Sequence, residues 1–304
     1  MTGETPSPFE VVLLGTGSPI PGPDRCGTGH VVIAGDTRVL VDCGWGAGRR
    51  LFAAGVPPPL INVVCFTHMH SDHITDVPDF LMTRWTGGAQ APLTVYGPEG
   101  TRDMIDGFLA ALARDIGFRF AHHGDKLSRE GIRCVVNELP AEADAVPVAE
   151  LDGLAIKAFE VDHRPVVPAL GYRFEYQGRT LAFSGDTKPC DSLVQGARDA
   201  DLFVCEALNL AMFNAFLETV RERNPNMAAI LDDAIAYHSA TEDVARMARD
   251  AGVRHLVLSH LMPAVPPDDA KALADFTAGM SDVFAGRLTV GRDLQRLVVG
   301  EAEG

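Results

Sequence analysis

The chain has 304 residues, of which 46% are hydrophobic and 22% are charged, a composition typical of a globular protein. A formal net charge of −15 at pH 7 opposes the binding of polyanions unless a local basic patch exists, and the sequence shows none, since Arg49-Arg50 is its only adjacent pair of basic residues; nucleic acid and anionic lipid are therefore disfavoured as partners. No apolar run approaches the roughly 18 residues that a membrane span needs, which excludes a membrane-spanning protein. Residues 1–10 have neither a basic start nor an apolar stretch, and we therefore expect a cytoplasmic protein.

Short apolar runs rich in Val, Ile and Leu alternate with turn signals along the chain. They predict strands at Val11–Leu14, Val31–Ala34, Val39–Asp42, Val63–Phe66, Leu93–Tyr96, Ile132–Val136, Leu154–Phe159, Leu181–Ser184 and His255–Ser259. Apolar residues at helical spacing predict a helix between Tyr96 and Asp115. Ser239 and Glu242 form a capping-box pattern, which predicts the start of another helix near Thr241. This order favours two packed sheets with helices outside, in a single domain over residues 1–304.

Two segments have no clear role in this scheme. Residues 117–147 lack a clean period, and residues 207–237 carry an apolar, helix-like stretch that is broken at Asn224-Pro225. Both fit pocket walls or lids, and the second fits core packing or a subunit contact equally well. A homodimer therefore stays open.

The strongest chemical signal is the motif His68-Met69-His70-Ser71-Asp72-His73, which follows an apolar strand-like run. Three imidazoles and a carboxylate within one short loop supply the nitrogen and oxygen donors that suit zinc or a similar divalent ion. A single loop cannot direct enough ligands towards a metal ion, so residues distant in the sequence must complete the metal site. His163, Asp186 and His260 are candidates, because each stands where an apolar strand opens into a loop.

Further segments follow the same order as in a known family. They are Leu14-Gly15-Thr16-Gly17-Ser18, Val41-Asp42-Cys43-Gly44, Gly97-Pro98-Glu99-Gly100, Gly171-Tyr172-Arg173, Ser184-Gly185-Asp186-Thr187, His238-Ser239 and Ser259-His260. With them the chain resembles the metallo-β-lactamase superfamily, in the branch of ribonuclease Z-like and arylsulfatase-like hydrolases. The resemblance implies an α/β fold, a four-layer αββα sandwich with metal ions at the sheet edges.

The resemblance also implies a ligand set for two divalent ions, with zinc expected first and manganese or iron as alternatives. It puts His68, His70 and His163 on one ion, Asp72, His73 and His260 on the other, and Asp186 between them. A hydroxide bridging the two ions would then be the nucleophile, because two cations lower the pKa of bound water towards neutrality.

Three residues complete the expected catalytic set: Asp72, His238 and Glu206. In the resembling family, a histidine in the place of His238 protonates the leaving group, and a glutamate in the place of Glu206 orients it. The chain departs from the ribonuclease Z pattern at Cys205, where that family usually has another histidine. Asp42 is a candidate to steady a ligand histidine.

For function, the sequence favours hydrolysis of a small phosphodiester or sulfate ester, with a small-molecule ester as the partner. Residues 158–163 followed by 171–174 resemble the arylsulfatase-like members. Hydrolysis of a lactone or β-lactam ring is the alternative. Cleavage at tRNA 3′ ends ranks lower, since only thirteen residues, Phe174 to Asp186, fill the interval in which ribonuclease Z proteins insert a tRNA-gripping arm.

Overall fold

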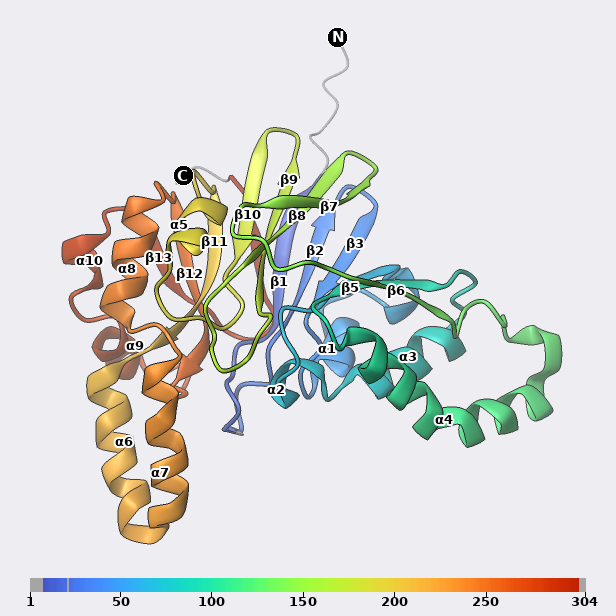
Figure 1. Cartoon of the computed structure of the whole chain (residues 1–304), viewed down its shortest axis with the longest axis horizontal. Coiled ribbons are helices and arrows are strands. Elements are labelled where there is room, and N and C mark those ends of the chain that lie inside the picture. Colours follow the sequence, from blue (N-terminus) through green and yellow to red (C-terminus); the bar gives the residue numbers. More distant parts are fainter. Residues whose placement is uncertain (1–7, 21, 301–304) are drawn as a thin grey trace.

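The computed structural model describes residues 8–20 and 22–300, so most of the segment used for the expectation about the N-terminus lies outside it. Two sheets pack face to face, and helices cover both outer faces (Figure 1). This arrangement is the αββα sandwich that the resemblance implied. None of the described helices is long and apolar enough to cross a membrane.

The first sheet has the order β14-β1-β2-β3-β4-β5-β6. Its strands are β1 (Phe9–Gly15), β2 (Gly29–Ala34), β3 (Thr37–Val41), β4 (Val63–Cys65), β5 (Leu93–Gly97), β6 (Cys134–Glu138) and β14 (Gln295–Val298). The run from β3 to β6 is parallel, whereas β14, β1, β2 and β3 pair antiparallel. Chain segments that leave β3, β4 and β5 therefore emerge at one edge of the sheet.

The second sheet has the order β13-β12-β11-β10-β9-β8-β7. Its strands are β7 (Val146–Leu151), β8 (Leu154–Glu160), β9 (Leu170–Tyr176), β10 (Arg179–Phe183), β11 (Leu202–Leu208), β12 (His255–Met262) and β13 (Arg287–Val290). Strands β10 to β13 are parallel, and β8 runs in the same direction because β9 is antiparallel to both β8 and β10. Their carboxyl ends also meet at one edge.

The helices lie mostly on the outer faces. They are α1 (Ala47–Ala53), α2 (Ser71–Ile74), α3 (Val77–Thr86), α4 (Thr101–His123), α5 (Asp191–Gly196), α6 (Leu210–Arg223), α7 (Pro225–Asp233), α8 (Thr241–Asp250), α9 (Ala270–Phe276) and α10 (Met280–Val283), with 3-10 turns η1 (Pro58–Leu60), η2 (Gly124–Lys126) and η3 (Ala234–Ala236). Figure 1 shows α1 and α3 beside the first sheet and α5, α8 and α10 beside the second.

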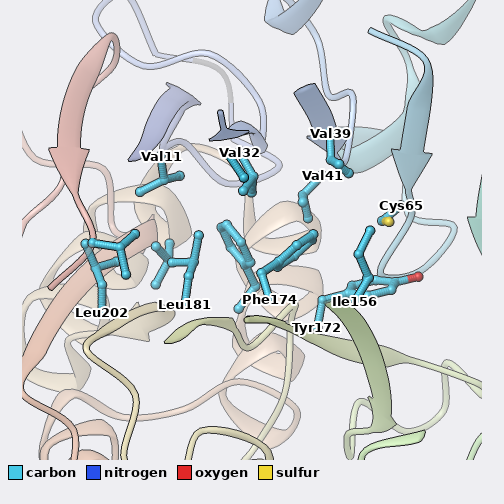
Figure 2. Close-up of a cluster of buried hydrophobic side chains, with 14 of the residues drawn as sticks. Val11, Val32, Val39, Val41, Cys65, Ile156, Tyr172, Phe174, Leu181 and Leu202 are labelled. Carbon is cyan, nitrogen blue, oxygen red and sulfur yellow. The ribbon is translucent and has the colours of Figure 1, made fainter. Parts of the chain in front are cut away.

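The core between the sheets is built from the inward-facing side chains of both. Figure 2 shows Val11, Val32 and Val41 of the first sheet facing Tyr172 and Phe174 of the second. These side chains are essentially inaccessible to solvent, and each apolar side chain buried in this way stabilises the fold by roughly 1.5–3 kcal/mol. The packed interface fixes the two sheet edges relative to each other.

Each of the nine expected strands overlaps a strand of the structure, although β6 begins two residues later than expected, at Cys134. The capping box is wrong: α8 does begin at Thr241, but its N-cap is Ala240, which makes no side-chain cap. Ser239 instead donates its hydroxyl to the carbonyl of Thr187, 2.6 Å away. The Ser239 side chain, which the local pattern assigned to the helix cap, thus makes a tertiary hydrogen bond instead.

The two unassigned segments contain regular elements. Residues 117–147 hold the end of α4, η2, β6 and the start of β7. Residues 207–237 hold the end of β11, α6, α7 and η3, and Figure 1 shows α6 and α7 lying side by side and projecting from the body. The break falls at Asn224, whose side chain accepts a hydrogen bond from the N–H of Met227 and caps α7. Pro225 then occupies the first turn, where its missing N–H costs nothing.

Candidate metal centre

The side chains expected to carry the chemistry lie where the two sheet edges meet. The motif loop leaves β4 and continues into α2, so it belongs to the first sheet. His163 follows β8, Asp186 follows β10, and His260 lies near the end of β12. Because these strands run in one direction, their carboxyl ends carry the three side chains to the same place.

Asp42 organises the motif loop. It follows β3 and is 1% exposed, and its carboxylate accepts hydrogen bonds from the backbone N–H and the hydroxyl of Thr67, both at 2.8 Å. The same carboxylate lies 2.8 Å from Nδ1 of His73. Asp42 thus steadies a histidine of the motif from behind, in the place that the sequence suggested for it.

The seven candidate ligands come together in two groups that share Asp186. His68, His70, His163 and Asp186 form one group, and Asp72, His73, Asp186 and His260 form the other, with ligand atoms within 4.8 Å of one another in each. All seven are buried except His70, which is half-buried. Asp186 Oδ2 lies 3.3 Å from Nε2 of His73, 3.2 Å from Nε2 of His260 and 3.7 Å from Nε2 of His68.

Hydrogen bonds fix which ring nitrogen faces this centre. The Thr67 hydroxyl donates to Asp42 and so accepts from Nδ1 of His68, at 3.1 Å. Nδ1 of His163 donates to the carbonyl of Tyr237 at 3.0 Å, because a carbonyl can only accept. In both rings the proton is therefore on Nδ1, and Nε2 presents a lone pair.

Three atoms of the centre are consistent with a cation between them. Nε2 of His68, Nε2 of His73 and Oδ1 of Asp186 are buried and have no hydrogen-bond partner among the described residues. Buried polar atoms are rarely left in this state unless a bound group uses them. Neutral imidazoles and carboxylates at this spacing fit divalent metal ions, and zinc in particular accepts such a set.

The pKa values in the centre are set by burial and by charge. Burial, followed by the proximity of His73, lowers the pKa of His68 well below its usual range, so this ring is neutral, as a ligand must be. Burial alone would lower the pKa of His73 too, but Asp186 and Asp72 outweigh it and raise that pKa strongly. The buried carboxylates thus impose a negative potential that favours cations at this point.

His238 and Glu206 form a second buried unit beside the ligands. Nδ1 of His238 lies 2.9 Å from Oε2 of Glu206, and the other carboxylate oxygen accepts from the N–H of Thr187 at 2.6 Å. The ring of His238 stacks on that of His260, with centroids 5.3 Å apart. Glu206, His238 and His260 also form a third group of ligand-like atoms, so His238 stands close enough to act on anything held at the centre.

Beneath the ligands lies a cavity of about 20 Å³ that His30, Ser259 and His260 help to line. Nδ1 of His30, the hydroxyl of Ser259 and Nδ1 of His260 are buried without partners among the described residues. A cavity of this size with several polar groups has room for one water molecule. Burial lowers the pKa of His30 to about 3, so its ring is neutral at physiological pH.

Two residues of the centre have unusual backbone conformations. Asp42 and His260 have φ of 57° and 46°, in the left-handed region that residues with a side chain rarely adopt. The pairing of β11 with β12 shifts register between Glu206 and Ala207, at the level of His260. Backbone strain of this kind costs on the order of 1–3 kcal/mol and is concentrated at functional sites. Here it falls at Asp42, directly after β3, and at His260, within β12.

Fold and centre together define a metal-dependent hydrolase, and the chain belongs to the beta-lactamase superfamily, whose domain model matches residues 37–261. Among curated proteins it is 38% identical over 294 residues to ribonuclease Z of Mycobacterium bovis, covering 96% of this chain and 98% of that protein. It is 39% identical over 297 residues to ribonuclease Z of Mycobacterium marinum, covering 96% and 99%.

Solved structures agree on the fold. The metallo-beta-lactamase fold protein YhfI from Bacillus subtilis superposes with a TM-score of 0.70 at 20% identity, covering 96% of this chain and all of that one. The short form of human tRNase Z gives a TM-score of 0.66 at 22% identity, covering 95% and 98%. At these identities, the two structures support the fold alone.

The relatives overturn two expectations from the sequence. A small phosphodiester or sulfate ester was ranked first as substrate and nucleic acid was disfavoured, yet curated relatives of nearly full length are named for a ribonuclease. The interval from Phe174 to Asp186 does lack an arm, since β9 and β10 are joined by a tight turn at Gln177-Gly178. Helical projections occur elsewhere, however, and a net charge of −15 describes the whole chain and no local surface.

Some supporting residues were not found from the sequence. The backbone carbonyl of Tyr237 orients His163, but a carbonyl carries no signal in a sequence. Ser184 and Thr187 hold Glu206, through the contact of the Ser184 hydroxyl with the Glu206 N–H at 3.0 Å and through the Thr187 N–H. Both belong to the segment Ser184-Gly185-Asp186-Thr187, which was singled out only for its aspartate.

Proposed function

We propose that this chain is an endonuclease of the ribonuclease Z type, which hydrolyses a phosphodiester bond at the 3′ end of precursor tRNA. The observation that carries the proposal is the near full-length identity of 38% with ribonuclease Z of Mycobacterium bovis. The buried His238–Glu206 pair beside the candidate ligands adds a chemical reason. A ribose oxygen is a poor leaving group and needs a proton as the bond breaks, and a histidine held by a carboxylate can supply one.

The proposal assigns the metal ligands as the sequence suggested. His68, His70 and His163 would hold one divalent ion, Asp72, His73 and His260 a second, with Asp186 shared, and zinc is the expected metal. Such ions supply an activated water at neutral pH and stabilise the charge that develops on the phosphate. Glu206 would orient His238, and Thr187 would hold Glu206 in place through its N–H. Asp42 would keep His73 fixed.

The test uses a precursor tRNA with a 3′ trailer and the zinc-loaded protein. We expect one cut between the body of the tRNA and the trailer, mapped by sequencing both products. An Asp186→Asn variant serves as the inactive control, since Asp186 touches both ligand groups. Failure to cut any precursor tRNA, combined with rapid turnover of a small diester by the same preparation, would refute the proposal.

A further inference from the structure

The fully buried histidines among the candidate ligands differ in what holds the ring nitrogen that faces away from the centre. In three of them Nδ1 has a hydrogen-bond partner elsewhere in the chain, at 2.8–3.1 Å: His68, His73 and His163. Nδ1 of His260 is buried as well, but it has no partner in the part of the chain that the structure describes. His260 is therefore the one member of this set whose outer nitrogen still needs a partner.

The carboxylates of the centre show which way the His260 ring points. Its Nε2 lies 3.1 Å from Oδ2 of Asp72 and 3.2 Å from Oδ2 of Asp186, so Nε2 faces the centre and Nδ1 faces away from it. A histidine that ligates a metal through Nε2 carries its proton on Nδ1 and nearly always donates that proton to a second group. A buried N–H without an acceptor costs about 1–3 kcal/mol, so we expect an acceptor close to Nδ1 of His260.

Two polar side chains from opposite sheets meet beside His260. In β2, His30 lies on the same face as Val32, which packs in the core between the sheets. In β12, Ser259 lies on the same face as Val257, which belongs to the same core. Because side chains alternate along a strand, His30 and Ser259 both point into the space between the sheets, where they line the cavity beneath the ligands.

The unpaired atoms around this cavity of about 20 Å³ fit a single water molecule. Nδ1 of His30 and the Ser259 hydroxyl are buried and, like Nδ1 of His260, have no hydrogen-bond partner among the described residues. A buried water commonly makes about three hydrogen bonds. The ring of His30 also stacks on that of Phe183, with centroids 5.3 Å apart, which holds the ring in its orientation.

The donors and acceptors around the cavity balance if His30 is the acceptor. Burial lowers the pKa of His30 to about 3, with His73 and His260 contributing, so its ring is neutral at physiological pH. One nitrogen of a neutral imidazole carries a lone pair and accepts a hydrogen bond. The Ser259 hydroxyl and Nδ1–H of His260 can both donate. A water can accept these two hydrogen bonds and donate one of its own to His30.

We propose that one water molecule in this cavity accepts hydrogen bonds from Nδ1–H of His260 and from the Ser259 hydroxyl, and donates one to Nδ1 of His30. His30 is then a positioning residue, because through the water it fixes the ring of His260 and keeps the lone pair of Nε2 directed at the metal. The inference rests on the proposed function only in the assignment of His260 as a metal ligand, and it does not depend on the substrate.

Three variants separate the hydrogen bond from packing. His30→Phe keeps an aromatic ring against Phe183 and removes the ring nitrogens. His30→Asn carries an amide oxygen in the place of Nδ1 and can still accept a hydrogen bond. His255→Phe is the matched control: His255 is another buried histidine, on β12, whose Nε2 lies 2.9 Å from the Thr289 hydroxyl, and it does not line the cavity.

Zinc affinity is measured by competition with a chelator, with no substrate present. For His30→Phe we expect the affinity for one of the two zinc equivalents to fall about 10–100-fold, the usual cost of losing a group that orients a ligand. His30→Asn should recover most of that loss, and His255→Phe should bind zinc as the wild type does. Unchanged affinity in His30→Phe, or an equal loss in either of the other two variants, overturns the inference.

The wild type provides a second test that no folding defect can obscure. In NMR spectra of the zinc-loaded protein with isotope-labelled histidine, His260 should carry a slowly exchanging proton on Nδ1 with a cross-peak to a bound water. The His260 signal is identified by its loss in His260→Ala. A crystal structure of the zinc-loaded protein should place one water within hydrogen-bond distance of His30, Ser259 and His260. A dry cavity, or a direct contact between the two rings, overturns the proposal.

The outcomes separate this inference from the proposed function. Specific cleavage of precursor tRNA by the wild type, with zinc affinity unchanged in His30→Phe, refutes the positioning role alone. Weakened zinc binding in His30→Phe, with no cleavage of precursor tRNA by the wild type, refutes the proposed substrate alone. Unchanged zinc binding in His260→Ala refutes the ligand assignment, and the inference falls with it.

Discussion

Replacing His238 tests whether this residue is a general acid, a metal ligand or a structural partner of Glu206. In the wild type, Nδ1 of His238 lies 2.9 Å from Oε2 of Glu206. The amide of His238→Asn can still donate a hydrogen bond towards Glu206, but it cannot deliver a proton to a leaving group. Loss of a general acid costs about 10²–10⁴ in rate, or about 2.7–5.4 kcal/mol at 1.36 kcal/mol per tenfold change. The loss should apply to an RNA substrate, whose leaving oxygen must be protonated.

The same variant should lose far less activity on an ester of p-nitrophenol, because that leaving group departs as a stable anion. The assay is therefore kcat across diesters of graded leaving-group pKa, with bound metal measured in each preparation. His163→Ala is the matched control, since it removes a proposed ligand and should lower metal content. His238→Ala, by contrast, also leaves Oε2 of Glu206 without a partner, while Oε1 keeps the Thr187 N–H, and the unpaired buried oxygen costs about 1–3 kcal/mol in stability, which a melting curve detects.

Two results would refute the reasoning. An equal loss of rate at every leaving-group pKa would mean that His238 does not protonate the leaving oxygen. Loss of one metal equivalent in His238→Asn would place this residue in the coordination set, through the group that it forms with Glu206 and His260.

Three further predictions concern the metals and the fold. The purified, zinc-replete protein should contain about two metal equivalents by elemental analysis, and a value that stays at or below one would remove the shared role of Asp186. Asp186→Asn and His260→Ala should each abolish turnover with far-ultraviolet circular dichroism unchanged, and near-wild-type activity in either would show the ligand assignment to be wrong. The pKa of His30 is about 3 in the fold against about 6.5 when unfolded, so the unfolded chain binds the extra proton and stability falls as pH drops from 6.5 towards 3. The unfolding free energy of His30→Leu should therefore fall less steeply between pH 6.5 and pH 3 than that of the wild type. Parallel curves of unfolding free energy against pH for the two proteins would contradict the lowered pKa of His30.

The sequence predicts elements well where the pattern is local. The alternating or continuous apolar runs at β1, β2, β4 and β8 are also the strands of the structure, because each fills one face or both faces of a sheet. Strand β11 is fully buried, yet it was missed, since its run Leu202–Leu208 is interrupted by Glu206. That glutamate is tolerated in a buried strand because His238 and Thr187 satisfy it from elsewhere in the chain.

A tertiary contact explains why the capping box failed. Ser239 and Glu242 fit a capping box in sequence, but the Ser239 hydroxyl is occupied by the Thr187 carbonyl. The candidate ligands could be named in advance because histidine and aspartate at strand ends are chemically distinctive. The substrate class could not be named in advance. The charge of the whole chain and the absence of one insertion do not show how an element such as α4 projects from the body.

The shared position of the candidate ligands has a consequence for folding itself. The motif loop belongs to one sheet, whereas His163, Asp186 and His260 belong to the other, so any cation bound between them adds a link between two halves that apolar packing and a few hydrogen bonds, such as that from the Tyr172 hydroxyl to the Phe66 carbonyl, already join. Binding that requires the native arrangement adds RT ln(1 + [L]/Kd) to the free energy of unfolding, about 4 kcal/mol when the free ion exceeds its Kd a thousandfold. Metal supply in the cell would then set the lifetime of the protein as well as its activity.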